Sequence, residues 1–159
     1  MKKITLRLLI VLAISLLTNC NKSIIFDEKV MFSDANWAFE NKAITFKVPM
    51  TGSEKSFTVI LELDLIGTPN VDLMNVYVTT ISPNGARTDK GFVFNFNAPK
   101  EPYIKGASPN EKIYRMTVYP KKYFSETGEY TFIVDQYSNK ADNYGIRALR
   151  LYIERVKEK

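Results

Sequence analysis

The sequence predicts an all-β fold, namely a single antiparallel β-sandwich, jelly-roll-like, of about seven or eight strands. The first observation is alternation: apolar and polar residues take turns through most of the chain beyond residue 43, as in strands buried on one face. The second is that Gly, Pro, Asn and Ser gather between these runs, where turns need them. The third is that no stretch keeps a 3.6-residue period for more than about three turns, the length of an ordinary helix.

Residues 1–19 have the features of a lipoprotein signal peptide. Met1-Lys2-Lys3 gives a positively charged start, and an apolar run follows from Leu8 to Leu17. About ten residues of helix measure about 15 Å, half of the ~30 Å hydrocarbon core of a bilayer. The run is therefore too short to span a membrane and suits the apolar core of a signal peptide.

Cys20, the single cysteine of the chain, ends a segment with the form of a lipobox, Leu17-Thr18-Asn19-Cys20. We expect lipid on its sulfur, cleavage before it, and an acyl chain such as palmitate on its new amine. A plain secretory leader and an uncleaved anchor are the alternatives, but residues 17–19 lack the small residues that a plain leader needs at its cleavage site. Two acyl chains already anchor a protein stably, so a membrane is the first expected partner.

Behind Cys20, we expect residues 20–36 to form a lipid-anchored N-terminal tether that leads into a first strand, and residues 37–159 to form the β-sandwich domain. The tether assignment rests on irregular spacing, with short apolar clusters at 24–26 and 30–32. No internal repeat or linker divides the rest of the chain.

Seven later runs alternate and predict strands. The clearest places apolar side chains at every second position from Phe57 to Leu65. The expected strands lie at 44–48, 57–65, 74–79, 92–96, 114–118, 130–135 and 149–154. The side chains expected inside are those of Leu61, Leu63, Phe94, Phe132, Leu149 and Leu151.

The composition restricts the function. The chain has no histidine, which excludes histidine bases, Ser-His-Asp and Cys-His systems and histidine metal ligands. Three of the 22 basic residues lie in the leader, which leaves 19 basic against 17 acidic side chains, too even a balance for a nucleic-acid partner. We therefore expect no enzyme activity, no cofactor, no metal site and no nucleic-acid binding.

Two acidic motifs have a functional and a plainer interpretation. Glu62 and Asp64 lie two apart on one strand face, roughly 6.5–7 Å from each other, a spacing also seen in glycosidases. The solvent face of a half-buried strand is the favoured interpretation. Asp142 and Asn143 could provide oxygen ligands for calcium, but this segment lacks the 6–8 oxygen ligands of a usual calcium site. The favoured interpretation is a turn before the last strand.

Aromatic residues suggest an alternative function, a lipid-anchored carbohydrate-binding β-sandwich module. Trp37, Tyr77, Tyr137 and Tyr152 are the candidates for stacking on sugar rings, provided that they line up on a flat exposed face. Packing in the core or in cross-strand pairs is the competing interpretation.

A second candidate surface precedes and enters the last strand. Tyr144, Arg147 and Arg150 cluster there, and Tyr and Arg are the residues that most often anchor protein interfaces. We expect these three residues to bind a protein partner.

Several segments together resemble the GldH family of gliding-motility lipoproteins from Bacteroidetes. The resemblance begins at about Trp37 and includes Asn75-Val76-Tyr77-Val78, then Ser82-Pro83-Asn84-Gly85 with Asp89. Residues 124–132 look like the family's F-x-x-x-G-x-Y-x-F run, with Gln136 after it. The end of the chain, Gly145-Ile146 followed by Leu149-Arg150-Leu151 and Ile153-Glu154, looks like the family's G-I…L-R-I-E ending.

The resemblance implies a divergent, non-catalytic member: an outer-membrane lipoprotein that is a structural or adaptor component associated with gliding motility and the type IX secretion machinery. Its partners would be other envelope proteins of that machinery. The segment after Cys20 has no acidic residue before Asp27, whereas surface-exported lipoproteins of this group tend to carry an early acidic cluster. We therefore expect the protein to face the periplasm.

Overall fold

The computed structural model describes residues 23–53, 55–97, 103–105 and 110–156, with the side chains of 103–105 left out. The strands are β1 (Ile24–Met31), β2 (Ala43–Thr51), β3 (Ser56–Ile66), β4 (Leu73–Ile81), β5 (Arg87–Asn95), β6 (Tyr103–Lys105), β7 (Glu111–Tyr123), β8 (Thr127–Tyr137) and β9 (Ile146–Arg155). Two 3₁₀ turns, η1 (Ser33–Ala35) and η2 (Phe39–Asn41), lie between β1 and β2. No helix in these residues is long and apolar enough to cross a membrane.

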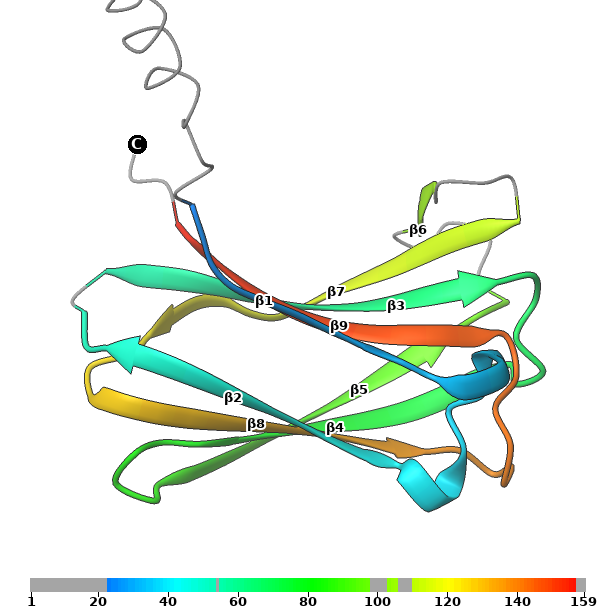
Figure 1. The fold of residues 1–159 in the computed structure, drawn as a ribbon, viewed down its shortest axis with the longest axis horizontal. Helices are drawn as coiled ribbons and strands as arrows, with labels where there is room; N and C mark the ends of the chain where they lie inside the picture. The colour runs from blue at the N-terminus through cyan, green and yellow to red at the C-terminus, as the bar shows by residue number, and fades with distance from the viewer. Residues whose placement is uncertain (1–22, 54, 98–102, 106–109, 157–159) are drawn as a thin grey trace, which may run out of the picture.

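The strands form two antiparallel sheets packed face to face (Figure 1). One sheet has the order β1-β9-β3-β7-β6 and the other β2-β8-β4-β5. If the short β6 is set aside and the remaining strands are counted in chain order, the sheets read 1-8-3-6 and 2-7-4-5, the order of a jelly roll. The predicted fold class is therefore confirmed.

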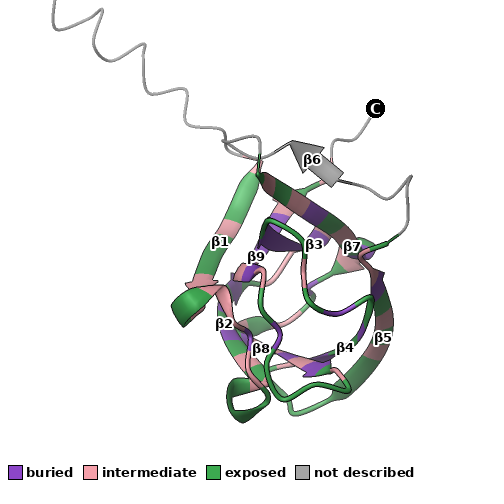
Figure 2. Ribbon diagram, turned by 90° about the vertical axis from the view of Figure 1, so that its right-hand side faces the viewer, coloured by how far each residue is buried: buried purple, intermediate pink, exposed green. Residues whose placement is uncertain are grey.

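The core lies between the sheets and is built by the predicted alternation. All six side chains expected inside, those of Leu61, Leu63, Phe94, Phe132, Leu149 and Leu151, are fully buried. In β2 and β8, every second residue is buried or half-buried and its neighbours are more exposed, as the banded colours of Figure 2 illustrate. The seven predicted strands correspond to β2–β5 and β7–β9.

Strand β1 differs from the expected organisation, because Ile24–Met31 lies inside the stretch assigned to the tether. It pairs with β9 from Ile24 opposite Glu154 to Met31 opposite Ala148, so the folded domain begins before residue 37. The strand lies at the edge of its sheet and is mostly exposed (Figure 2), which explains why its apolar pattern is weak. The short β6 was not expected either.

Candidate functional site

Cys20 lies outside the described residues. The described chain starts at Ser23, whose carbonyl accepts a hydrogen bond from the Arg155 amide, 2.6 Å away. The two ends of the domain therefore meet at the same end of the five-stranded sheet (Figure 1).

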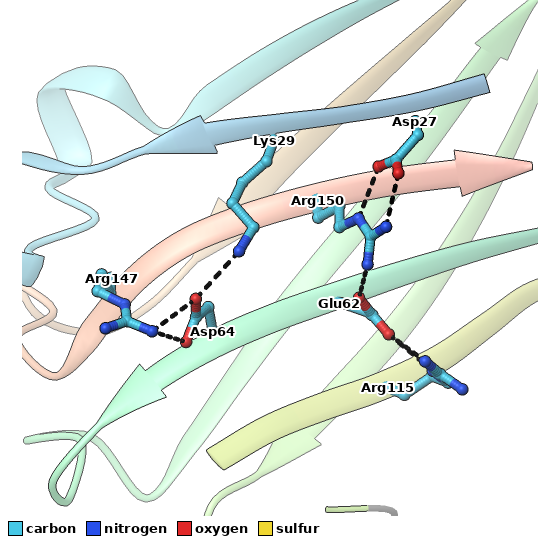
Figure 3. Close-up of polar contacts among 7 residues, drawn as sticks. All are labelled: Asp27, Lys29, Glu62, Asp64, Arg115, Arg147 and Arg150. Carbon is cyan, nitrogen blue, oxygen red and sulfur yellow. Dashed lines mark hydrogen bonds and ion pairs between the residues drawn. The ribbon is translucent and has the colours of Figure 1, made fainter. Parts of the chain in front are cut away.

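The two arginines of the predicted partner surface lie on the outer face of that sheet, bound to carboxylates (Figure 3). Arg150 donates to both oxygens of Asp27 at 2.6 Å and to Glu62 Oε2 at 2.8 Å. Arg147 binds both Asp64, at 2.8 Å, and Glu111. These contacts raise the pKa of both guanidiniums, while the hydrogen bonds from Arg150 hold the pKa of Asp27 below its usual range.

Glu62 and Asp64 are buried, contrary to the expectation that they face solvent. They lie on β3, the central strand of the five-stranded sheet, and long side chains from the neighbouring strands cover them. Glu62 also accepts from Arg115 Nε at 2.7 Å, and Asp64 from Lys29 Nζ at 3.2 Å. Each carboxylate is thus held by two cations, which suits a structural role better than that of a general acid or base.

Tyr144 is exposed, in the loop before β9, and its carbonyl accepts from the Asn70 amide. It is the member of the predicted partner surface whose side chain is most open to solvent, since Arg147 and Arg150 are about two-thirds or more covered. The role of these three residues in binding a partner stays a prediction.

The four aromatic candidates separate into two groups. Trp37 and Tyr152 are buried, and Tyr152 lies beneath the guanidiniums of Arg115 and Arg150. Tyr77 and Tyr137 are about half exposed and lie together on the outer face of the four-stranded sheet. The expectation of exposed aromatic residues thus applies to Tyr77 and Tyr137 and is wrong for Trp37 and Tyr152.

The strand register brings the two tyrosines together. Asn75 of β4 lies opposite Tyr137 of β8, and Tyr77 lies opposite Asp135, so the tyrosines are diagonal neighbours. Their ring centroids are 5.2 Å apart and the ring planes meet at 82°. We call Tyr77, Tyr137 and Asn75 the tyrosine patch.

Two hollows adjoin the tyrosine patch. One, of about 470 Å³, is bounded by the three residues of the patch. The other, of about 390 Å³, shares Asn75 and Tyr137 and is otherwise lined by Asn70, Val71, Asp72, Leu73, Asn139 and Lys140. Both volumes are in the range of small-ligand sites.

The loop between β8 and β9 is held in place from inside the domain. The side-chain amide of Asn143 donates to the Trp37 carbonyl at 2.8 Å, and Trp37 stacks on Phe32 with centroids 5.3 Å apart. Asp142 Oδ1 accepts from the Asn36 amide at 2.8 Å. The pair considered for calcium thus fixes the loop that carries Asn139 and Lys140.

Lys42 completes the surroundings of Tyr137. Its ammonium lies 5.0 Å from the centroid of the Tyr137 ring and 5.0 Å from that of Phe39. Lys42, Asn75 and Asn139 were not expected from the sequence to belong to a site. Asn75 had one available signal, since it is the polar residue two positions before a candidate tyrosine on the same strand face.

No protein-family model and no curated protein matches the sequence. Among solved structures, the chain is similar to dimeric latent PorU from Porphyromonas gingivalis, with 12% identity, a TM-score of 0.39 and 84% of this chain covered. The chain spans only 13% of the length of that PorU chain. A likeness this distant says nothing about function, and the resemblance to the GldH family is not confirmed by these comparisons.

Proposed function

We propose that this protein is a lipoprotein of the outer membrane that acts by binding other envelope components and not by catalysis. In this proposal Cys20 carries the anchor and the β-sandwich faces the periplasm. The resemblance to GldH lipoproteins supports a more specific role, as a structural or adaptor component associated with gliding motility and the type IX secretion machinery.

The observation that carries the proposal is the tyrosine patch. Tyr77 and Tyr137 contact each other and expose 49% and 46% of their surface. Folding does not require aromatic side chains at these two positions, because the outer face of a sandwich can carry polar residues. Tyrosine provides large contact area at a low cost in conformational entropy, and it is enriched where proteins bind their partners. The patch and its hollows are therefore a part of the described surface that is suited to binding.

The position of the patch fits an anchored protein. Four residue steps separate Cys20 from Ile24, so the anchor lies at most about 14 Å from the start of β1. Strand β1 then runs about 25 Å toward η1 and η2, the end of the domain at which Lys42 and Tyr137 meet. Asn75 and Tyr77, near the start of β4, and Tyr137, at the end of β8, thus lie on the other sheet, and Figure 1 shows this end of β8 away from the start of β1.

The absence of catalysis is proposed from the residue chemistry. Histidine does not occur in the sequence, and the only cysteine is assigned to the lipid. Glu62 and Asp64, the pair with glycosidase-like spacing, are each held by two cations beneath the surface. Both carboxylates are therefore poorly placed for contact with a substrate.

The test is capture from the native envelope. Tagged full-length protein is crosslinked in cells and purified from the membrane fraction, beside Cys20→Ser and the double variant Tyr77→Ala/Tyr137→Ala. We expect Cys20→Ser to leave the membrane fraction and the double variant to stay there but to lose its crosslinked components. Tyr123→Ala, which removes another exposed tyrosine, is the matched control. Membrane retention of Cys20→Ser, or an unchanged set of components for the double variant, would contradict the proposal.

A further inference from the structure

We infer that the tyrosine patch binds sugar rings of a neutral polysaccharide. This inference rests on the proposed function, because it names the class of ligand for the same surface. It follows from the angle between the two rings, the amides beside them, the form of the hollows and the balance of charge.

The flat aromatic face expected for stacking on sugar rings is not formed, because the rings of Tyr77 and Tyr137 meet in a corner. Tyr77 leans against β5, because its cross-strand neighbour is Gly91, and a Cβ at that position would lie 3.1 Å from Tyr77 Cε1. Tyr137 stands at 82° to it and is contacted by Lys42. A pyranose has an apolar face of C–H groups, which packs on an aromatic ring, and an edge of hydroxyl groups, which need hydrogen-bonding partners.

The amides provide matching hydrogen bonds. A carboxamide both donates and accepts, as a sugar hydroxyl does. Asn75 is exposed between the two hollows, and Asn139 borders one of them. Both side chains are exposed, and neither makes a hydrogen bond to another of the described residues, so both are available to a ligand.

The hollows favour a chain over a single enclosed molecule. They meet at Asn75 and Tyr137, which belong to both, and both are open to solvent. A ligand that occupies both hollows must therefore cross Tyr137, with one part of the ligand in each hollow. A polysaccharide segment has this shape, with one sugar unit on either side of the ring.

The even balance of charges favours a neutral ligand over a polyanion. Asp72 lines one hollow, and Asp135 lies opposite Tyr77 on the same sheet face. Lys42 and Lys140 offset these carboxylates, but Lys140 already donates to the Asn70 carbonyl. With two carboxylates against two partly engaged ammonium groups, a neutral glycan fits better than a phosphate or uronate chain.

A protein partner is the weaker interpretation of this surface. A stable protein interface buries about 800 Å² on each partner and has an apolar centre. The hollow of about 390 Å³ beside the patch instead has three amides, one carboxylate and one lysine among its eight lining residues. That lining suits a ligand whose surface is mostly hydroxyl groups.

The experiment is calorimetric titration of the full-length lipoprotein with soluble polysaccharides: a mixed-linkage β-glucan, an α-mannan, a xyloglucan and a dextran, with polygalacturonate as the anionic comparison. The detergent must lack a sugar headgroup, since a glycoside would compete for the patch. We expect at least one neutral polysaccharide to bind. Tyr137→Ala and Tyr77→Ala should each weaken that binding about tenfold or more, equivalent to about 1.4 kcal/mol.

Two further variants separate the roles of ring and amide. Tyr137→Phe keeps the ring and is expected to bind within about threefold of wild type, whereas Asn75→Ala removes the shared amide and is expected to bind more weakly. Tyr123→Ala should bind as wild type does. Because the substituted residues are exposed, unchanged circular dichroism and thermal midpoints are expected for all variants.

The result that overturns the inference is either no binding of any neutral polysaccharide or binding that Tyr77→Ala and Tyr137→Ala leave unchanged. Preferred binding of polygalacturonate would also overturn it. If no polysaccharide binds but the tyrosine variants still lose crosslinked envelope proteins, the ligand class is wrong and the proposed function stands. Failure of both experiments would remove the proposed function as well.

Discussion

The guanidinium of Arg150 bridges Asp27 of β1 and Glu62 of β3, donating at 2.6 Å to the former and at 2.8 Å to the latter. The contact crosses three neighbouring strands and connects the edge strand to the centre of the sheet (Figure 3). It explains why a carboxylate as buried as Glu62 is tolerated on the outer face.

Loss of this contact should destabilise the domain. We expect Arg150→Ala to lower the free energy of unfolding by about 2–4 kcal/mol, because Glu62 is buried and keeps only Arg115. Arg87→Ala breaks an exposed pair with Asp89 and should cost much less, because solvent screens the two charges. Urea denaturation followed by fluorescence of Trp37, the single tryptophan and fully buried, measures both. Equal losses would show that Arg150 has no special role.

For the same reason, replacing Arg147 and Arg150 together with Glu is expected to unfold the domain, so that it cannot serve as a test of partner binding. Tyr144→Ala is the appropriate variant, because Tyr144 is exposed and its contact with Asn70 is made by its backbone carbonyl. If this surface binds a protein of the envelope, Tyr144→Ala should lose that protein in crosslinking while the thermal midpoint is unchanged. Retention of every partner would leave the tyrosine patch as the binding surface.

The ion pair also makes stability depend on pH. Hydrogen bonding to Arg150 lowers the pKa of Asp27 below its ordinary value of 3.8 in the folded protein. Its contribution to stability is therefore complete above the unfolded pKa and is lost as the pH falls through the lowered folded pKa. We expect Asp27→Asn to be less stable than wild type at about pH 7 and to approach it at about pH 2. A difference that grows in acid would contradict this assignment.

Two glycines form a matched pair for testing close packing at the loop before β9. Gly145 has φ +89°, and a Cβ there would lie 2.8 Å from Pro69 Cα, whereas Gly67 has φ +68° and open space around it. Gly67→Ala should cost about 1–2 kcal/mol from backbone strain alone. Gly145→Ala should cost about 2–5 kcal/mol, because the clash with backbone is added. Thermal denaturation of the two variants measures the difference, and similar midpoints would contradict the close approach.

Gly91→Ala tests the orientation of Tyr77. Gly91 lies in β5 and has an ordinary strand backbone, so alanine is tolerated there, but its Cβ would push the Tyr77 ring away from β5. We expect the thermal midpoint to stay within a few degrees and polysaccharide binding to weaken. The substitution Thr45→Ala, in strand β2 and outside the tyrosine patch, is the control and should leave polysaccharide binding unchanged. Unchanged polysaccharide binding by Gly91→Ala would show that binding does not depend on the orientation of the Tyr77 ring against β5.

Cellular location is open to a direct test. If the protein faces the periplasm, protease added to intact cells should leave it whole, and protease added after permeabilisation should cleave it. Immunoblotting of the tagged protein measures both, with a known surface protein as the positive control. Cleavage in intact cells would refute the periplasmic assignment.

Much of the fold was predictable because one repeating physical requirement produces it. Each strand between the sheets must turn alternate side chains inward, and Phe57 to Leu65 or Tyr130 to Val134 carry that requirement in their order alone. The bounds of strand β1 were not predicted, because an edge strand buries few side chains. Its apolar pattern is interrupted by Asp27, Glu28 and Lys29.

The candidate site was only partly predictable because it depends on register. Tyr77 and Tyr137 were both named from the sequence, but their contact follows from the pairing of Asn75 with Tyr137, which no local pattern reveals. The same holds for Glu62, which was assigned to solvent because alternation identifies a face but not what lies above it. Its cover comes from Arg115 and Arg150 on the two adjacent strands.

The antiparallel pairing of β1 with β9 has a mechanical consequence. If Cys20 carries the proposed anchor and the tyrosine patch holds a ligand, tension enters at the amino end of β1 and the ligand pulls from the opposite end of the domain. The tension then acts along the strand, perpendicular to the hydrogen bonds between β1 and β9. For β1 to slide along β9, these hydrogen bonds must break together and not one at a time. Under such a load, the pairing of β1 with β9 would resist unfolding in this direction more than in a direction that peels β1 from the sheet edge.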